Sequence, residues 1–235
     1  MKYRHIRKAE FIERLNRFIA RVWIDGREET VHVKNTGRCR ELLVKGAVVY
    51  IEKSENPARK TKYDLVAVEK QRDDGSSLLI NIDSQVPNQA VEEWLCKGEL
   101  FSSDAVVRRE CTYGNSRFDF RIEENGQISF LEVKGVTLEH DGIALFPDAP
   151  TERGVKHINE LIKAVGDGFG AYIMFVIQMK GIREFRPNDD THKDFGDAMR
   201  AAERAGVRLL AYDCIVNPDG MVIDKPIKIR TEQIL

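Results

Sequence analysis

Short apolar runs separated by turn residues fill the first third of the chain. Five of these runs are rich in β-branched or aromatic residues and predict strands at Phe18–Ile24, Thr30–Val33, Ala47–Ile51, Leu65–Val68 and Leu78–Ile82. Glycine, asparagine, aspartate and proline lie between the runs, which favours tight turns there. Five short strands within about eighty residues indicate a small closed barrel.

Beyond Ile82 the pattern changes to alternating helices and strands. Helical spacing of apolar residues predicts helices at Val86–Leu95, from about Thr151 to Gly166 and from about His192 to Ala205. Strands are predicted at Ser116–Ile122, Gln127–Val136, Ala171–Met179 and Val207–Asp213. This order is typical of an α/β domain with a mixed central sheet. We therefore divide the chain, which is α+β overall, into a barrel at 1–83 and an α/β domain at 84–235.

The first two strands of the α/β domain are joined by the dipeptide Asn125-Gly126, the strongest signal for a two-residue type I′ hairpin. In that register Asp119 lies directly opposite Glu132, which shares a strand face with Lys134.

The other face of this hairpin supports the same register. It pairs Phe118 with Val133 and Phe120 with Leu131, which gives an apolar surface. A shift of one residue would place Glu132 beside Phe118, so burial favours the first register.

Two carboxylates about 4.5–5.5 Å apart across a strand pair repel each other, and a divalent metal would compensate for this. Mg²⁺ selects oxygen ligands and usually takes one or two carboxylates plus waters and phosphate. Lys134 would then supply a cation for charge that develops on a phosphate, or would orient the attacking water. The residues also allow a surface hairpin in which Arg117, Arg121 and Lys134 simply pair with the acids.

The net charge of −1 gives the chain no overall attraction for a polyanion, but the charge is unevenly distributed. Residues 1–62 carry 16 basic and 8 acidic side chains, whereas residues 63–235 carry 21 basic and 30 acidic ones. A basic segment beside an acidic one favours nucleic-acid contact by the basic part. A solvated basic surface is the alternative.

The basic segment coincides with the predicted barrel, and the OB-fold is the five-stranded barrel most often used for oligonucleotides. Its loop Lys34–Arg40 places Lys34, Arg38 and Arg40 around a glycine, an arrangement suited to phosphate. An ordinary polar loop remains the alternative, because a barrel alone does not fix a ligand.

Composition excludes several classes of protein. With 42% hydrophobic and 32% charged residues the chain can form a core, which excludes a disordered chain. The longest apolar run, Ala171–Met179, is too short to span a membrane, and no apolar segment follows the basic N-terminus as in a secretory signal. The four cysteines lie too far apart for a zinc site, so we expect reduced thiols. We expect a cytoplasmic protein with no membrane partner.

Longer motifs carry a resemblance to a known family. Arg117-Phe-Asp119-Phe and Leu131-Glu132-Val-Lys134-Gly resemble the metal-dependent nuclease motif of PD-(D/E)xK type. The continuation Phe146-Pro-Asp-Ala-Pro-Thr-Glu-Arg-Gly-Val-Lys-His-Ile-Asn-Glu-Leu161, together with Asn35-Thr36-Gly37, resembles the sugar fermentation stimulation protein A (SfsA) family over essentially the whole chain. The resemblance implies an N-terminal OB-like domain, a C-terminal restriction-endonuclease-like domain and DNA as the partner.

Carried over by position, the resemblance implies that Asp119, Glu132 and the Val133 carbonyl hold Mg²⁺ or Mn²⁺, and that Lys134 orients water or stabilises charge. No small-molecule cofactor is implied, and a homo-oligomer remains open.

Five further residues are candidates for supporting roles. Arg153 and Lys156 near a helix N-terminus would contact phosphate, or would form ordinary surface pairs. His157 is a candidate general acid or base, although a single histidine is more often structural. Glu110 would be a helical glutamate that assists the metal. Gln178 is either a site residue or a core amide satisfied by the backbone.

The sequence therefore predicts a DNA-binding protein with a metal-dependent nuclease-type site that hydrolyses phosphodiester bonds. The name of the family that the chain resembles implies the competing hypothesis, a non-catalytic DNA-binding transcriptional regulator of sugar (maltose-type) utilisation. Whether the chain is an enzyme therefore stays open. Carbohydrate binding by the barrel is weaker, because sugars do not call for a strongly basic barrel.

Overall fold

Five strands close into a barrel at the N-terminal end of the chain. In the computed structural model, which describes residues 1–35 and 37–232, the five strands are β1 (Ile6–Arg14), β2 (Ile19–Ile24), β3 (Arg27–Val33), β4 (Val48–Lys53) and β5 (Tyr63–Gln71). A sixth strand, β6 (Ser77–Asn81), follows them. Each of β1 to β5 pairs with two neighbours in the ring, and the parallel β3–β5 pairing closes it. This is the predicted five-stranded OB barrel.

The membership of the ring differs from the sequence prediction. Strand β1 was missed, because charged residues fill its exposed positions and leave only Ala9 and Phe11 buried in its middle. The predicted strand Leu78–Ile82 corresponds to β6, which pairs only with β5 and lies outside the ring. The whole segment 1–83 carries 18 basic and 13 acidic side chains, so the barrel is less basic than residues 1–62 alone.

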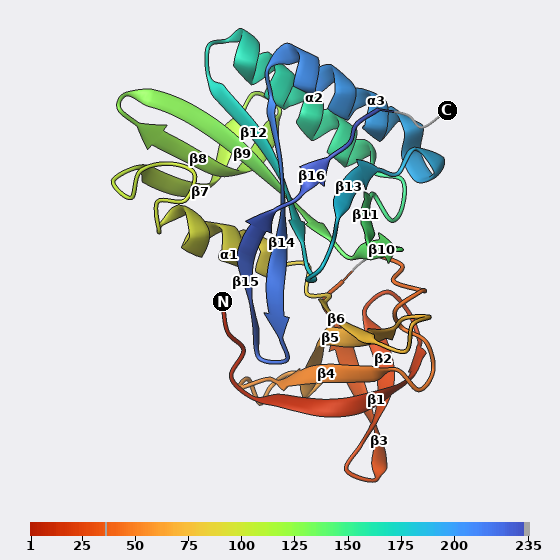
Figure 1. Cartoon of the computed structure of the whole chain (residues 1–235). Helices are drawn as coiled ribbons and strands as arrows, with labels where there is room; N and C mark the ends of the chain where they lie inside the picture. The colour runs from red at the N-terminus through yellow and green to blue at the C-terminus, as the bar shows by residue number, and fades with distance from the viewer. Residues whose placement is uncertain (36, 233–235) are drawn as a thin grey trace.

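The rest of the chain forms a mixed sheet covered by helices, as predicted (Figure 1). The sheet order is β15 (Gly220–Pro226), β14 (Arg208–Asn217), β12 (Gly170–Ile177), β9 (Gln127–Val136), β8 (Ser116–Glu124) and β7 (Val106–Tyr113). The three central strands are parallel, whereas both edges are antiparallel hairpins. A smaller sheet contains β10 (Leu138–His140), β11 (Ile143–Phe146), β13 (Glu184–Pro187) and β16 (Lys228–Ile229).

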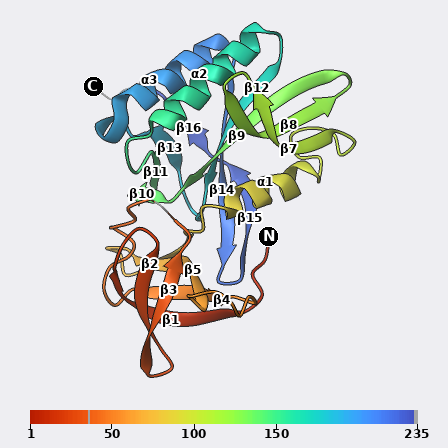
Figure 2. The same cartoon turned by 180° about the vertical axis from the view of Figure 1, so that it is seen from behind.

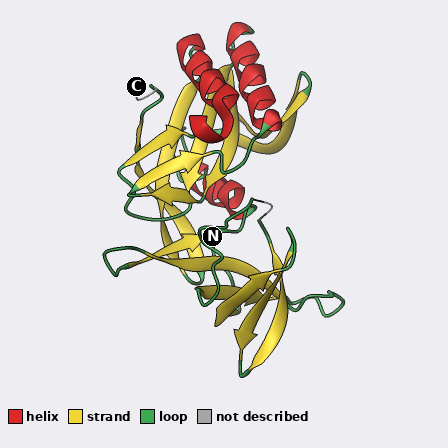
Figure 3. Cartoon of the chain, turned by 90° about the vertical axis from the view of Figure 1, so that its right-hand side faces the viewer, coloured by secondary structure: helices red, strands yellow, loops and turns green. Residues whose placement is uncertain are grey.

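Helices cover both faces of the large sheet. Helices α2 (Glu152–Gly166) and α3 (Asp189–Ala205) lie side by side on one face, and α1 (Val86–Leu95) lies on the other (Figure 3). Alternate residues of β12 enter the two apolar clusters, Phe175 below α2 and Met174 towards α1. Because both faces are buried, this strand reads as a continuous apolar run.

The barrel lies at the end of the α/β domain opposite α2 and α3 (Figures 1 and 2). The junction is polar and closely packed: Gln178 accepts a backbone hydrogen bond from Asn81, and its side-chain amide donates to the Asn81 carbonyl at 3.0 Å. Residues 1–3 pack on the α/β domain, where Lys2 pairs with Gly220. Among the described residues, no helix has the length and apolar character needed to cross a bilayer.

The β8–β9 hairpin has the predicted turn and register. Asn125 and Gly126 have φ angles of 50° and 79°, and the pairing runs from Glu124↔Gln127 to Phe120↔Leu131. The pairing stops there, so the expected Phe118–Val133 contact is wrong. Phe118 packs instead with Phe130, in the cluster below α2.

The physical reason is a local irregularity at the middle of β8. Phe118 and Phe120 are two residues apart yet belong to different apolar clusters. On β7, Glu110 lies between the partners of these two residues and has a φ of 53°, an uncommon conformation for a residue other than glycine. Asp119 lies at this irregularity, between the residue that packs below α2 and the residue that packs towards α1.

Candidate metal and nucleic-acid site

Asp119 occupies the point where β8 and β9 separate. Its Oδ2 accepts a hydrogen bond from the Val133 backbone N–H at 2.7 Å, in place of a backbone partner on β8. Its Oδ1 accepts from the side-chain amide of Asn88 on α1, also at 2.7 Å. Asn88 escaped the sequence analysis because nothing in the local motif connects α1 with the hairpin.

Glu132 is buried, with 3% of its surface exposed. Its Oε1 accepts from the Lys134 Nζ at 2.5 Å and from the Nδ1 of His157. Its Oε2 is also buried and has no hydrogen-bond partner among the described residues. Because an unpartnered buried carboxylate oxygen is costly, this atom needs a cation or a water.

His157 lies on α2 and is buried beneath the sheet. Its Nε2 faces the Arg153 Nε at 3.4 Å, while its Nδ1 faces Glu132. Since arginine only donates, Nε2 acts as the acceptor and Nδ1 carries the proton. The imidazole therefore holds the Glu132 carboxylate in place, and Phe118 packs edge-on against its ring.

The two carboxylates have opposite pKa shifts. Burial, followed by the charge of Glu132, raises the pKa of Asp119 above its ordinary value. Burial also acts to raise the pKa of Glu132, but the hydrogen bond from His157 and the charge of Lys134 outweigh it and lower that pKa. The site therefore keeps Glu132 ionised while it resists a second negative charge beside it, a balance that a bound cation would change.

The carbonyl of Val133 belongs to the same site. An extended residue directs its N–H and C=O towards the same neighbouring strand. The Val133 N–H donates to Asp119, so its carbonyl also faces the gap that opens between β8 and β9.

These residues fit a magnesium-type cation. They offer the carboxylate of Asp119, the carboxylate of Glu132 with its unpartnered Oε2, and the carbonyl of Val133. These are the hard oxygen ligands that Mg²⁺ prefers. The described residues contain no cluster of three His, Cys, Asp or Glu side chains suited to a metal, as zinc would require.

The remaining candidates from the α/β domain make other contacts. Arg153 and Lys156 are exposed on α2, and the Lys156 Nζ donates to the Asn115 carbonyl at 2.8 Å. Glu110 is exposed on strand β7 and pairs with Arg117 at 3.3 Å. The expectation of a helical glutamate there is wrong, because the residue continues an edge strand.

Gln178 is buried at the domain junction. Its Nε2 donates to the carbonyls of Asn81 and Asp83 at 3.0 and 3.1 Å. These contacts match the alternative of a core amide satisfied by the backbone, although the residue also lines a cavity between the domains.

The three cations of the predicted phosphate loop differ in their surroundings. The Lys34 Nζ lies 3.2 Å from Asp83 and 3.6 Å from Asp64, so its charge is already compensated. Arg38 and Arg40 are exposed and line a groove of about 620 Å³ between the barrel and residues 149–150. Thr36, in the predicted turn, lies outside the described residues.

Arg14 and Arg17 complete this groove, and the sequence analysis did not single them out. The Arg14 guanidinium donates to backbone carbonyls that hold the loop, namely those of Asn16, Arg17, Asn35, Gly37 and Arg38. Arg14 therefore shapes the loop, whereas the exposed Arg17, Arg38 and Arg40 present charge to the solvent. We call this surface the arginine groove.

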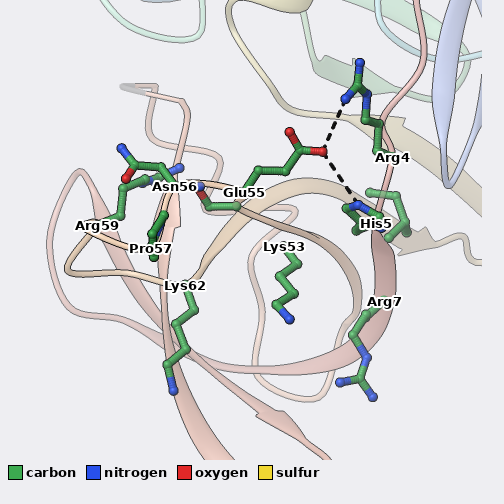
Figure 4. Close-up of a pocket in the computed structure, with 11 residues that line it drawn as sticks. Arg4, His5, Arg7, Lys53, Glu55, Asn56, Pro57, Arg59 and Lys62 are labelled. Atoms are coloured by element: carbon green, nitrogen blue, oxygen red, sulfur yellow. Dashed lines mark hydrogen bonds and ion pairs between the residues drawn. The ribbon is translucent and has the colours of Figure 1, made fainter.

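A second basic concavity of about 920 Å³ lies on the barrel between the start of β1 and the β4–β5 loop (Figure 4). Glu55 pairs there with Arg4 and His5. Lys53 and Lys62 extend from its wall and form no ion pair among the described residues. Their charges are spread over separate sequence segments, which is why the loop analysis missed the surface.

Comparison with known proteins follows the same two-part division. A family model described as "SfsA N-terminal OB domain" matches residues 12–81, and one described as "Sugar fermentation stimulation protein RE domain" matches residues 85–220. The chain belongs to the SfsA family. It is 55% identical to the sugar fermentation stimulation protein homolog of Ruminiclostridium cellulolyticum over 98% of this chain and 100% of that one.

A second curated relative and a solved structure are also similar to the chain over nearly its whole length. The homolog of Clostridium beijerinckii is 53% identical, over 95% of this chain and 96% of that protein. The solved structure titled "The structure of Pyrococcus Furiosus SfsA in complex with Ca2+" has a TM-score of 0.83 and 26% sequence identity, with 98% of each chain covered.

Proposed function

We propose that this SfsA protein binds DNA and hydrolyses its phosphodiester bonds with a divalent metal held between Asp119 and Glu132. The observation that carries the proposal is the buried, unpartnered Oε2 of Glu132, in a site where Lys134 and His157 occupy only the other oxygen. In an ordinary surface ion pair, both carboxylate oxygens contact a donor or water. A buried oxygen without a partner is instead what a cation site provides.

The ligand chemistry supports Mg²⁺ or Mn²⁺ held by Asp119, Glu132 and the Val133 carbonyl. The similar Pyrococcus furiosus structure is described as a complex with Ca²⁺, another cation that takes oxygen ligands. Such a metal, when bound, lowers the pKa of a bound water and offsets charge on a phosphate.

The side chains of this chain supply the other parts of the reaction. The amide of Asn88 fixes the carboxylate of Asp119, and the imidazole of His157 fixes that of Glu132. The Lys134 ammonium lies on the same face and is placed to donate to a phosphate oxygen as its negative charge increases. We assign to it the roles of orienting water and stabilising charge.

The arginine groove is the proposed path of the DNA backbone. Gly37 lines both this groove and the cavity between the domains. The same cavity is lined by Gly135, the residue after Lys134, so it lies between the groove and the proposed metal site. The Lys53/Lys62 concavity shares no lining residue with that cavity. Phosphates held by Arg17, Arg38 and Arg40 would therefore lead the strand towards the carboxylates.

Hydrolysis is tested by incubating the purified protein with labelled single-stranded, duplex and branched DNA, each with Mg²⁺, Mn²⁺ or EDTA. We expect cleavage that requires the metal, measured as product bands on a denaturing gel. Binding without cleavage of any substrate would contradict the nuclease and favour the non-catalytic regulator.

The DNA path is tested by charge reversal on the two basic surfaces. Arg38→Glu with Arg40→Glu is expected to lower DNA affinity at least tenfold at 0.1 M salt and to reduce the salt dependence, because the slope follows the number of phosphate contacts. Mg²⁺ affinity should stay unchanged. The matched pair Lys53→Glu with Lys62→Glu should have a clearly smaller effect in the same anisotropy titration. An equal or larger loss in that pair, or affinity without salt dependence, would contradict the proposed path.

A further inference from the structure

The cavity between the barrel and the α/β domain has the composition of a small ligand site. Its volume is about 160 Å³, it is partly open to solvent, and its walls combine polar Asn35, Asp148 and Gln178 with apolar Leu145 and Phe146. Sites that take drug-sized ligands are larger, about 300–1,000 Å³. The cavity is therefore suited to one planar ring system and not to a whole nucleotide.

Two glycines allow the side chains that line this cavity to pack closely against the backbone. A Cβ atom at Gly135 would lie 2.5 Å from the Oε1 of Gln178 and 2.9 Å from Pro87. A Cβ atom at Gly37 would collide with the Oδ2 of Asp148. Any larger residue at these positions would have to displace the oxygens that line the cavity.

Those oxygens are hydrogen-bond acceptors whose orientation is fixed. The amide nitrogen of Gln178 donates to Asn81 and Asp83, so its Oε1 is the end that faces Gly135. The amide nitrogen of Asn35 donates to the Ile82 carbonyl at 2.9 Å. The Oδ1 of Asn35 already accepts from the Gly37 N–H at 2.7 Å, and the Oδ2 of Asp148 accepts from the Arg38 N–H at 3.2 Å. Among the described residues this leaves the Gln178 Oε1 and the Asp148 Oδ1 as acceptors for a ligand that carries N–H donors.

The position of the cavity connects it with the proposed reaction. Gly135 follows Lys134, so their Cα atoms are about 3.8 Å apart. On α1, Pro87 packs towards Gly135 while the next residue, Asn88, holds Asp119. On the barrel side, Gly37 lines both the cavity and the arginine groove.

We propose that this cavity binds a single nucleobase with an exocyclic amino group, from a nucleotide next to the bond that is cut. Adenine, cytosine and guanine carry an amino group with two N–H donors, whereas thymine has no amino group and offers only the single N3–H of its ring. The base must leave its stack to enter, so the substrate is a single strand or a strand with an unpaired nucleotide at that position. This inference rests on the proposed function, because the polymer must lie along the arginine groove.

The test is a scan of a single-stranded 12-mer of adenine and cytosine in which each nucleotide in turn is replaced by an abasic residue or by thymine. Affinity is measured by fluorescence anisotropy in EDTA, so that no cleavage interferes. We expect one position where the abasic residue weakens binding by about tenfold and thymine also weakens it, since one bound base contributes a loss of that order. A flat scan would overturn the inference even if the DNA is bound and cleaved.

A pair of variants assigns the effect to the cavity. Leu145→Trp should fill the space and make intact and abasic strands bind equally, whereas Leu145→Met, of similar volume, should keep the position dependence. Thermal melting of both variants checks the fold, and the wild-type scan decides the question if Leu145→Trp does not fold. A position-dependent scan without cleavage in Mg²⁺ supports the pocket and contradicts the nuclease. Absence of DNA binding overturns both.

Discussion

Replacing Asp119 by alanine is expected to abolish metal-dependent DNA cleavage. The change removes one of two carboxylates and leaves Glu132 to hold the cation with a carbonyl and water. A catalytic metal supplies several kcal/mol of transition-state stabilisation. Since about 1.4 kcal/mol corresponds to a factor of ten in rate, the cleavage rate should fall at least about 100-fold. The measurement is the single-turnover rate in Mg²⁺ on whichever DNA the wild type cuts.

The control for this variant is Glu123→Ala, which removes a partly exposed carboxylate from the same hairpin, where it pairs only with Arg121 among the described residues. It should cleave at the wild-type rate. DNA affinity in EDTA should not fall in Asp119→Ala, because the side chain carries negative charge. Cleavage by Asp119→Ala within a few-fold of wild type would contradict the assigned site.

Replacing Asp64 by alanine is expected to cause the largest loss of stability. Asp64 is 3% exposed and accepts two hydrogen bonds from Arg59, at 2.7 and 2.6 Å. The Lys34 Nζ lies 3.6 Å from the Oδ2 of the same carboxylate, and the His32 Nδ1 lies 3.1 Å from its Oδ1. Removing Asp64 leaves Arg59 without its carboxylate, whereas Lys34 keeps its nearer partner Asp83. Breaking a buried ion pair costs about 3–5 kcal/mol, and we expect about 3 kcal/mol here because Arg59 is partly exposed. Urea unfolding at pH 7 measures the difference.

The pH dependence of that loss follows from the pKa of Asp64. Burial acts to raise this pKa, but the hydrogen bonds from Arg59 and the charge of Lys34 outweigh it and lower the pKa in the folded state. The stabilisation is therefore present above the unfolded value of about 3.9 and is lost as the pH falls through the folded value. The difference between wild type and Asp64→Ala should shrink below about pH 4.

The control for stability is Lys193→Ala, which removes an exposed pair with Asp197 on α3. This change should cost less than about 1 kcal/mol. A loss of that small size in Asp64→Ala at pH 7 would show that the buried network does not stabilise the barrel.

The part of the site that sequence could predict is local. Asn125-Gly126 fixes the turn, and the alternation beyond it fixes the register as far as Phe120↔Leu131. The separation of the strands at Asp119 could not be predicted, because nothing in the hairpin sequence marks the end of the pairing at Phe120↔Leu131. Asn88 was missed because it lies on α1, 31 residues before Asp119 in the sequence, and only the tertiary structure brings the two together.

The barrel shows a similar division between local and distant effects. Most of its strands follow from apolar alternation, but β1 was obscured by charges on its outer face. Lys34 illustrates the limit for charged residues: its loop predicted phosphate contact, whereas Asp64 and Asp83, which follow much later in the sequence, fold back to compensate its charge. Which cations remain available for DNA is therefore a property of the tertiary structure.

The central claim is that Asp119 and Glu132 hold a divalent cation. A crystal of the wild-type protein soaked in Mn²⁺ and measured at a wavelength with manganese anomalous signal tests it most directly. The account predicts an anomalous difference peak between the two carboxylates, within coordination distance of the Glu132 Oε2. A map with ordered Asp119 and Glu132 side chains and no such peak would contradict it.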